Sequence, residues 1–302
     1  MSIKRERSPL VSRSSGTITS PDVDHFVTHG WVCIRNLLSP PELRMLQTES
    51  NHLYSCESTE SIVSQGCVMD ALAHYPMGDS DTAQVDSCCY LRARFKSKDV
   101  DNQQVFASLL FEKLPTIAGQ MLAACDKSKR APNIFFFNEH YVVKPPRSLV
   151  KFRWHRDDDE QLTMCVHRES IRAYISAWCA LDDVTRGNGA LQFVSLSVSP
   201  RSNEDNNDNM QRHASGPVTG EAGDVIFFLS NVWHCSSSNE SDGFRRAFYA
   251  QYSREKITSR RKNPTPLSFA IPCKIASSPW VIDESAENCV ESRAKKAKHA
   301  TR

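Results

Sequence analysis

Apolar residues in the first part of the chain recur with helical spacing. The run SPPE at residues 39–42 places a serine N-cap before two prolines and a glutamate, and it predicts a helix that runs toward Leu53. The segment before it, GWVCIRNLL at residues 30–38, predicts a short strand. Residues 105–126 also have helical spacing, but Pro115 interrupts them, so we expect two helices or one helix with a break there.

Further along, the pattern changes to short runs of aromatic and β-branched residues separated by turn signals, which is typical of strands. Because these strands follow the helices without β-α-β alternation, we expect a mainly β fold of two antiparallel sheets with flanking helices. The polar segment between Ser195 and Gly216 cannot contribute a core strand and is expected to be a long loop. The expected strands lie in the segments 133–144, 148–157, 171–183, 189–194, 223–236 and 244–253.

The two ends of the chain differ in composition from the part between them. Residues 1–21 are basic and rich in serine, and residues 276–302 end in a lysine- and arginine-rich run. We expect both segments to be disordered, because they have no apolar period from which to build a core. Residues 22–275 are expected to form one domain, since a chain of 302 residues can bury one substantial core.

The overall composition argues against several classes of protein. No apolar run approaches the ~20 residues that span a bilayer, so a membrane protein is not expected. A net charge of +2 gives no support to nucleic-acid binding, although both ends are locally basic. The eleven cysteines are odd in number and include no CxxC pair, which argues against a disulfide framework or a zinc knuckle. Because the N-terminus lacks an apolar secretory signal, we expect a cytoplasmic protein, with the nucleus as an alternative through the basic tail.

Three residues have the chemistry and spacing of a metal site. His155 and Asp157 are two apart in an expected strand, so their side chains should point to the same face. His234 follows an apolar run and can return to this pair through an antiparallel sheet. Two histidines and one carboxylate leave open coordination positions, the arrangement that suits Fe(II) and oxygen activation. The alternatives are that His155 is a surface histidine beside an acidic run and that His234 is a core histidine beside Trp233.

A possible partner for a carboxylate follows on the next expected strand. Arg245 lies eleven residues beyond His234, and its planar guanidinium can make two charge-assisted hydrogen bonds at once. Arg245 and Arg246 point to opposite faces of the strand, so at most one of them faces the site, and the spacing favours Arg245. The alternative is a pair of surface arginines.

The order of these motifs resembles that of the phytanoyl-CoA dioxygenase family, from His25 to Tyr252. The matching pieces are HFVTHGWVCIRNLLSPPEL, FFFNEHYVVKPP, WHRD, WCALDDVTRGNGALQFV, GDVIFFLSNVWHCSSSN and GFRRAFYAQYS. The chain has VSLSVSP where the family usually has Pro-Gly-Ser-His, so we expect a differently shaped substrate pocket and an unchanged iron site. The triplet is HRD rather than the commoner HQD, and because its aspartate is retained, a halogenase is disfavoured.

The resemblance implies a double-stranded β-helix, a cupin-like jelly roll, which uses Fe(II), 2-oxoglutarate and O2. The residues implied to ligate the iron are His155, Asp157 and His234. Arg245 is implied to hold the 2-oxoglutarate carboxylate. The residues implied to line the pocket beside it are Lys144, Trp178 and Asn188.

The expected reaction is hydroxylation of an unactivated C–H bond in a small organic substrate, with release of succinate and carbon dioxide. Family members act on acyl-CoA, amino-acid-derived and secondary-metabolite substrates, so the substrate stays open, as does the oligomeric state. The C-terminal ATR differs from the peroxisomal SKL signal, which disfavours a phytanoyl-CoA role. The alternatives are a non-catalytic jelly-roll interaction protein with a vestigial metal site and a structural zinc site, which is usually closed by four ligands.

Overall fold

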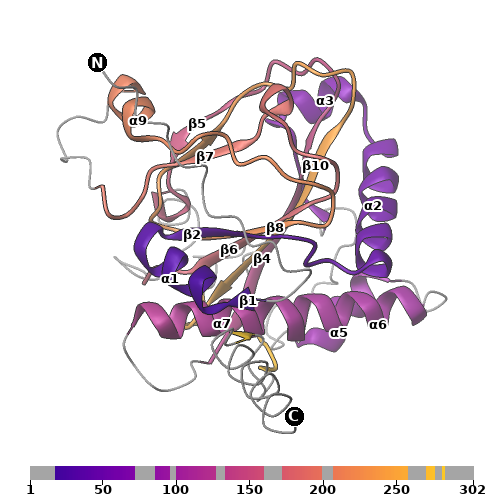
Figure 1. The fold of residues 1–302 in the computed structure, drawn as a ribbon. Coiled ribbons are helices and arrows are strands. Elements are labelled where there is room, and N and C mark those ends of the chain that lie inside the picture. The colour runs from indigo at the N-terminus through magenta and orange to yellow at the C-terminus, as the bar shows by residue number, and fades with distance from the viewer. Residues whose placement is uncertain are drawn as a thin grey trace, which may run out of the picture.

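The computed structural model describes residues 18–71, 86–95, 100–126, 133–159, 172–198, 207–257, 270–275 and 281–282. Within these residues the chain forms two antiparallel sheets that face each other, with helices on the outer side of the larger sheet (Figure 1). This arrangement confirms the expected mainly β fold with flanking helices. Among the described residues, no helix combines the length and the apolar character needed to cross a bilayer.

Most of the described strands divide between a larger and a smaller sheet. Those of the larger sheet are β2 (Trp31–Ile34), β3 (Val68–Met69), β4 (Phe135–Lys144), β6 (Ile175–Ala180), β8 (Val225–Leu229), β10 (Arg245–Ser253) and β11 (Ile271–Pro272). Those of the smaller sheet are β5 (Phe152–His155), β7 (Leu191–Phe193) and β9 (His234–Ser236). The larger sheet has the order β11-β4-β10-β6-β8-β2, with β3 also paired to β4, and the smaller sheet has the order β5-β9-β7. Strands that are neighbours in space are thus mostly distant in sequence.

The described residues also form helices and short helical turns. They are α1 (Ser20–His29), α2 (Pro40–Ser55), α3 (Thr59–Ser64), α5 (Ser87–Arg94), α6 (Val100–Ser108), α7 (Leu114–Cys125), the π-helical turn η1 (Leu109–Lys113), the 3-10 turn η2 (Arg186–Asn188) and α9 (Asn207–His213). Figure 1 shows α5, α6 and α7 beneath the larger sheet and α2 along one edge. The phenol of Tyr252 in β10 donates to the Leu110 carbonyl at 2.8 Å, which fixes the helical layer to the sheet.

The elements predicted before residue 56 are confirmed. Helix α2 begins directly after Ser39, where the Glu42 carboxylate accepts the Ser39 backbone N–H at 2.6 Å as in a capping box. Leu53 is fully buried near the end of this helix. Strand β2 occupies residues 31–34 of the predicted segment.

Pro115 does not break the chain into two separate helices. Elements α6, η1 and α7 follow one another without a gap, and the π-helical turn ends two residues before the proline. Because Pro115 has no N–H, the Phe111 carbonyl four residues earlier loses its usual intrahelical donor. That carbonyl instead accepts the backbone N–H of Lys274 at 3.0 Å, from the segment after β11. A distant part of the chain therefore satisfies the group that the proline leaves free.

A few described residues lie outside both expected domain boundaries. Strand β1 (Ile18–Thr19) pairs in parallel with β12 (Val281–Ile282), so each end segment contributes residues to a small sheet. Thr19 also caps α1, because its hydroxyl oxygen accepts the Asp22 backbone N–H at 3.4 Å and its own backbone N–H donates to the Asp22 carboxylate at 2.9 Å. The boundary expected at residue 22 thus falls inside α1. The rest of the two segments expected to be disordered lies outside the described residues.

Two further expectations need correction. The segment between Ser195 and Gly216, expected as one long loop, contains helix α9. Residues 199–206, which precede this helix, lie outside the described ranges. The predicted strand segment 223–236 forms two strands, β8 and β9, which belong to different sheets. The chain turns between them, where the Val232 N–H donates to the Leu229 carbonyl at 3.0 Å. This turn carries the backbone from the larger sheet to the smaller one and brings His234 across the gap between them.

The register of the larger sheet places several polar side chains on one face. Arg245 lies opposite Lys144, and Tyr249 lies opposite both His140 and Trp178. Residues at alternate positions of a strand share a face, so these side chains point in one direction. The direction is toward the smaller sheet, because Lys144 bonds to a residue of β9. The inner face of the larger sheet and the smaller sheet therefore enclose the polar site.

Candidate metal centre

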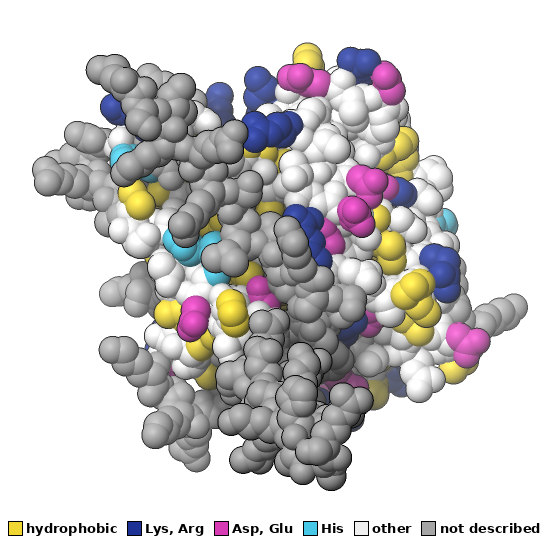
Figure 2. Space-filling model, in the orientation of Figure 1, with side chains coloured by type: hydrophobic (Ala, Val, Ile, Leu, Met, Phe, Trp, Pro, Cys, Tyr) yellow, Lys and Arg dark blue, Asp and Glu magenta, His cyan; other side chains and the backbone are white. Residues whose placement is uncertain are grey.

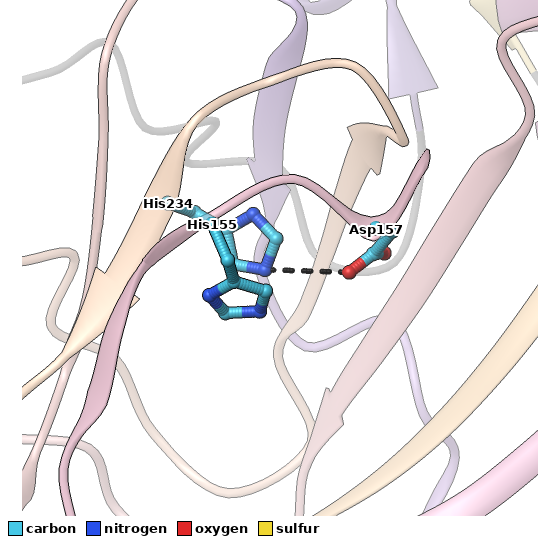
Figure 3. A group of neighbouring side chains, drawn as sticks. All are labelled: His155, Asp157 and His234. Carbon is cyan, nitrogen blue, oxygen red and sulfur yellow. Dashed lines mark ion pairs between the residues drawn. The ribbon is translucent and has the colours of Figure 1, made fainter. Parts of the chain in front are cut away.

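The structure brings His155, Asp157 and His234 together between the two sheets (Figure 3). One ligand atom from each residue can be chosen so that all three lie within 4.8 Å of one another. The Nε2 atom of His234 is 3.5 Å from Oδ1 of Asp157, and the two imidazole ring centres are 4.2 Å apart. Donor atoms that share an ion at bond lengths of ~2.0–2.2 Å lie at such separations. The three side chains can thus converge on one metal ion.

Cross-strand pairing, rather than spacing within one strand, positions this group. His155 ends β5 and is the register partner of His234, which begins β9. The register shifts between Phe152 and His155, so β5 contains an irregularity just before His155. Asp157 lies beyond the end of β5, at the start of a helical turn. The expectation that alternation within one strand aligns His155 with Asp157 is therefore wrong, although the side chains do meet.

Backbone carbonyls select one ring nitrogen of each histidine. Nδ1 of His155 bonds to the Arg153 carbonyl at 2.7 Å, and Nδ1 of His234 bonds to the Val232 carbonyl at 3.0 Å. With Nδ1 protonated in this way, Nε2 keeps its lone pair for a metal. Burial, with a smaller effect of His155, lowers the pKa of His234 to about 4, so this ring is neutral at physiological pH. A neutral imidazole is the form that binds metal.

The Asp157 carboxylate is buried and oriented by three hydrogen-bond donors. Ser176 donates to Oδ2 at 2.6 Å, Gln251 donates at 3.2 Å, and the Tyr249 hydroxyl also donates to it. Oδ1 is left facing His234. The sequence analysis missed these three donors, which share the inner face with Arg245 and Trp178 by strand alternation. Such outer hydrogen bonds fix the direction of a ligand carboxylate.

Arg245 has a buried guanidinium with two free ends. The residue is 1% exposed, and neither Nη1 nor Nη2 has a hydrogen-bond partner among the described residues. Its ring neighbour is Trp178, whose centre lies 5.5 Å from the guanidinium carbon. Burial lowers the pKa of Arg245 to about 10, so the group is still charged at neutral pH. A buried cation with unused parallel donors is complementary to a carboxylate.

Arg246 faces the other way, as strand alternation requires. Its guanidinium bonds to the Asp182 carboxylate at 2.9 Å through Nε and 2.6 Å through Nη2. The guanidinium donors of Arg246 are therefore already bonded to a carboxylate of the protein, whereas those of Arg245 can bind a ligand.

Lys144 and Trp178 also lie on the inner face beside Arg245, where the sequence analysis expected pocket residues. Lys144 is fully buried, and its Nζ donates to the Ser236 hydroxyl at 2.9 Å. The close approach of the chain beside Lys144 requires a glycine at position 189. Gly189 has a φ of +90°, and a Cβ there would lie 2.6 Å from the Ser237 carbonyl oxygen. The turn after η2 can therefore lie directly against the backbone of the smaller sheet.

Asn188 reaches the site only through its backbone. Its side-chain oxygen accepts the Thr185 N–H at 2.8 Å, and its side-chain nitrogen donates to the Asp183 carbonyl at 2.7 Å. Its own carbonyl lies 3.5 Å from Nε of Arg245. The expectation that the Asn188 side chain lines the pocket needs correction, because its amide holds the turn together.

The described donor set differs from that of a structural zinc site. Within the described ranges, the only group of three or more potential ligands is His155, Asp157 and His234, without a cysteine.

On the face of the molecule in Figure 2, lysine and arginine side chains alternate with acidic ones. The described residues on this face therefore carry charges of both signs.

The sequence and the fold both match known proteins. The model of the family described as phytanoyl-CoA dioxygenase (PhyH) matches residues 26–247. The comparison with curated proteins gave no match. Among solved structures, the chain is similar to the non-heme alpha ketoglutarate dependent carbocyclase SnoK from nogalamycin biosynthesis. The identity is 18% and the TM-score 0.55, over 88% of this chain and 98% of that one.

Two other solved structures have the same architecture. The non-heme alpha ketoglutarate dependent epimerase SnoN from nogalamycin biosynthesis has 15% identity and a TM-score of 0.54, over 85% of this chain and 96% of that one. AviO1 from Streptomyces viridochromogenes Tue57 has 19% identity and a TM-score of 0.50, over 80% of this chain and 96% of that one. At such low identities these similarities establish a shared fold.

Proposed function

The chain belongs to the phytanoyl-CoA dioxygenase family, and we propose that it is an Fe(II)- and 2-oxoglutarate-dependent oxygenase that hydroxylates an unactivated C–H bond of a small organic substrate. The observation that carries this proposal is the position of two complementary features on facing sheets. A group of two imidazoles and one carboxylate can hold Fe(II) and leave positions open. A buried arginine with two unused donors can hold the far carboxylate of 2-oxoglutarate.

In this proposal His155, Asp157 and His234 hold the iron. The Arg153 and Val232 carbonyls keep both imidazoles in the tautomer that presents Nε2, so no rearrangement is needed before the metal binds. The donors on Oδ2 of Asp157 leave Oδ1 for the metal. These contacts hold the three ligand atoms in place before the metal arrives, which is the usual contribution of outer hydrogen bonds to a metal site.

Arg245 and its neighbours bind and orient the co-substrate. The guanidinium offers two parallel N–H donors, and Trp178 supports its face. Arg245 and Trp178 are 1% and 3% exposed, so the carboxylate would bind in a pocket from which most water is excluded. Exclusion of water strengthens the charge-assisted bonds and protects the reacting groups from side reactions. Lys144 completes the wall of this pocket.

Bound iron would supply oxygen activation coupled to the oxidation of 2-oxoglutarate to succinate and carbon dioxide. The task of the described residues is to hold the metal and the co-substrate in fixed positions relative to the substrate carbon. The substrate class stays that of the sequence analysis: an acyl-CoA, an amino-acid-derived compound or a secondary metabolite.

The first experiment is an anaerobic titration of the metal-free protein with Fe(II), followed by 2-oxoglutarate. We expect a saturable iron complex whose visible spectrum changes on addition of 2-oxoglutarate. The variants His155→Ala, Asp157→Ala and His234→Ala should lose the iron complex. His52→Ala, which removes an exposed histidine of α2, is the matched control. An iron complex with no response to 2-oxoglutarate would refute the proposal and favour a vestigial metal site.

The second experiment identifies the reaction. Proteins of this fold include a carbocyclase and an epimerase, so the product must be measured rather than assumed. Compounds from a metabolite library are screened for stimulated succinate release, and each product is analysed by mass spectrometry. A gain of one oxygen atom supports hydroxylation. A loss of two hydrogen atoms, or a change of configuration without a change of mass, would replace hydroxylation by ring closure, desaturation or epimerisation at the same site.

A further inference from the structure

Two buried cations lie side by side in the proposed co-substrate pocket. Lys144 at the end of β4 is the register partner of Arg245 at the start of β10, and the residues are 0% and 1% exposed. Directly opposed residues of an antiparallel pair have Cα atoms only ~4.5–5.5 Å apart. Both side chains point toward the smaller sheet. The two positive charges therefore share one small volume from which water is largely excluded.

The groups that face Lys144 do not neutralise it. Nζ donates to the Ser236 hydroxyl at 2.9 Å and to the Ser237 carbonyl, both of which are uncharged acceptors. Strand β5 contributes the Phe152 ring, whose centre is 5.0 Å from Nζ. The turn after η2 contributes Gly189, which has no side chain.

Among the described residues, the other titratable groups that influence Lys144 are two thiols and Arg245. Cys67, just before β3, and Cys235 of β9 are close enough to stabilise the charge of Lys144 if they were thiolates. Burial raises the pKa of each thiol, however, so both are uncharged at neutral pH. Arg245 of β10 adds a like charge. In the part of the chain that the structure describes, no carboxylate pairs with Lys144 or with the free ends of Arg245. Among the described residues, the pocket thus holds two cationic side chains and no counter-ion.

Lys144, rather than Arg245, is the group that loses its proton. Two like charges in a poorly solvated pocket disfavour one another, and the cheapest relief is the loss of one proton. A guanidinium keeps its proton under these conditions, whereas an ammonium group releases it readily when buried. Burial and the neighbouring Arg245 lower the pKa of Lys144 to about 7. Without a ligand, Lys144 therefore loses much of its charge near neutral pH.

We propose that Lys144 is a second anchor for 2-oxoglutarate that becomes charged only in the complex, so that binding of the co-substrate takes up one proton at Nζ of Lys144. The inference rests on the proposed function. The distal carboxylate of 2-oxoglutarate brings to Arg245 and Lys144 the negative charge that the described residues do not provide. The proton comes from the solvent, and the one covalent change is the new N–H bond. A neutral lysine thus becomes an ammonium group paired with a carboxylate.

Linkage fixes the sign of the pH dependence. The complex binds more protons than the free protein, so the dissociation constant for 2-oxoglutarate should rise as pH rises above the pKa of free Lys144. The rise should approach tenfold per pH unit for one proton. Below that pKa, Lys144 is already protonated and the dissociation constant should be constant. A residue with only a structural role would not produce this profile.

Isothermal titration calorimetry tests the proposal. Protein loaded with redox-stable Ni(II) is titrated with 2-oxoglutarate near pH 7.5 in two buffers with different ionisation enthalpies, and the difference in heat gives the number of protons taken up. We expect between about half a proton and one proton. The comparison ligand is 2-oxopentanoate, which has the same chain length without the distal carboxylate, and it should take up none.

Two variants assign the proton to one atom. Lys144→Met, which has no ammonium group, and Lys144→Arg, which is permanently charged, should both bind 2-oxoglutarate without proton uptake and with a flat profile above neutral pH. Lys151→Met, at an exposed lysine near the start of β5, is the matched control and should behave like the wild type. If Lys144→Met does not fold, Lys144→Arg and the two ligands on the wild type still decide the question.

The outcomes separate this inference from the function on which it rests. Binding of 2-oxoglutarate by the wild type without proton uptake would overturn the role of Lys144 and leave the oxygenase proposal intact. Proton uptake that persists in Lys144→Arg would also overturn it, because another group would then be responsible. Absence of 2-oxoglutarate binding at every pH would refute the proposed function and this inference together.

Discussion

Replacing Arg245 should weaken 2-oxoglutarate binding and leave stability intact, whereas replacing Arg246 should do the reverse. Arg245 is buried with two free donors in the proposed pocket, whereas Arg246 is bound to Asp182 on the other face of β10. Arg245→Met should therefore lose affinity for 2-oxoglutarate while the ligand-free fold is preserved. Arg246→Ala should weaken the fold while affinity is preserved.

The magnitudes follow from what each guanidinium contacts. Removing one partner of a buried charge pair costs ~2–5 kcal/mol, so the dissociation constant of Arg245→Met should rise roughly 30-fold to several thousand-fold. In the ligand-free protein, the same change removes a buried charge that has no partner among the described residues, and because burying an unpaired charge is costly, the change should be neutral or stabilising. Arg246→Ala breaks charged hydrogen bonds that are partly buried, which should lower the free energy of unfolding by about 1–3 kcal/mol.

Two measurements on the same preparations separate these effects. The 2-oxoglutarate titration of the metal-loaded protein reports affinity, and thermal unfolding without ligand reports stability. Iron binding should survive in both variants, since neither residue ligates the metal. Arg245→Lys should recover part of the affinity, because an ammonium group restores the charge but not the paired donors.

The reasoning fails if the two defects are exchanged. A large loss of affinity in Arg246→Ala, beside near-normal binding in Arg245→Met, would mean that β10 is shifted by one residue and that its alternate side chains face the site. A large loss of stability in ligand-free Arg245→Met would mean that its guanidinium is paired in the free protein.

Three further predictions concern the metal site and its supports. His234→Ala should abolish Fe(II) binding in an anaerobic titration while the fold stays intact, and retention of stoichiometric iron would remove this residue from the ligand set. Tyr249→Phe removes one donor to Asp157 and should weaken Fe(II) binding about 10- to 100-fold, as for other outer-sphere partners; an unchanged affinity would show that the remaining donors suffice. Gly189→Ala should lower the melting temperature, because the residue has a φ of +90° and no room for a Cβ. An unchanged melting temperature would contradict the tight approach of this turn.

Local patterns were enough to identify most elements and the residues of the metal group. The SPPE run predicted the start of α2, and strand-like composition located β4, β6 and β10, because capping and alternation act over a few residues. The resemblance to the family added the role that the order of the motifs implies for His155, Asp157 and His234. These are statements about residue type and short spacing, which a sequence contains in full.

Other features depended on pairings between distant segments. Pro115 predicted a break, but the Phe111 carbonyl that it leaves free finds its donor at Lys274, more than a hundred positions away. The turn between β8 and β9 divides one apolar run between two sheets, and strand composition does not reveal which sheet a strand joins.

The site shows the same division. That histidines and a carboxylate are present, with an arginine beyond them, could be predicted from the sequence. That Asp157 lies past the end of β5, and that three donors from β6 and β10 orient it, could not. The opposition of Lys144 and Arg245 was also hidden, because it depends on the register between β4 and β10, and a slip of one residue would turn one of the two side chains to the other face. Residue types and spacings thus determined which chemical groups the protein has, and long-range strand register, set by the packing of the whole sheet, decided which of them meet.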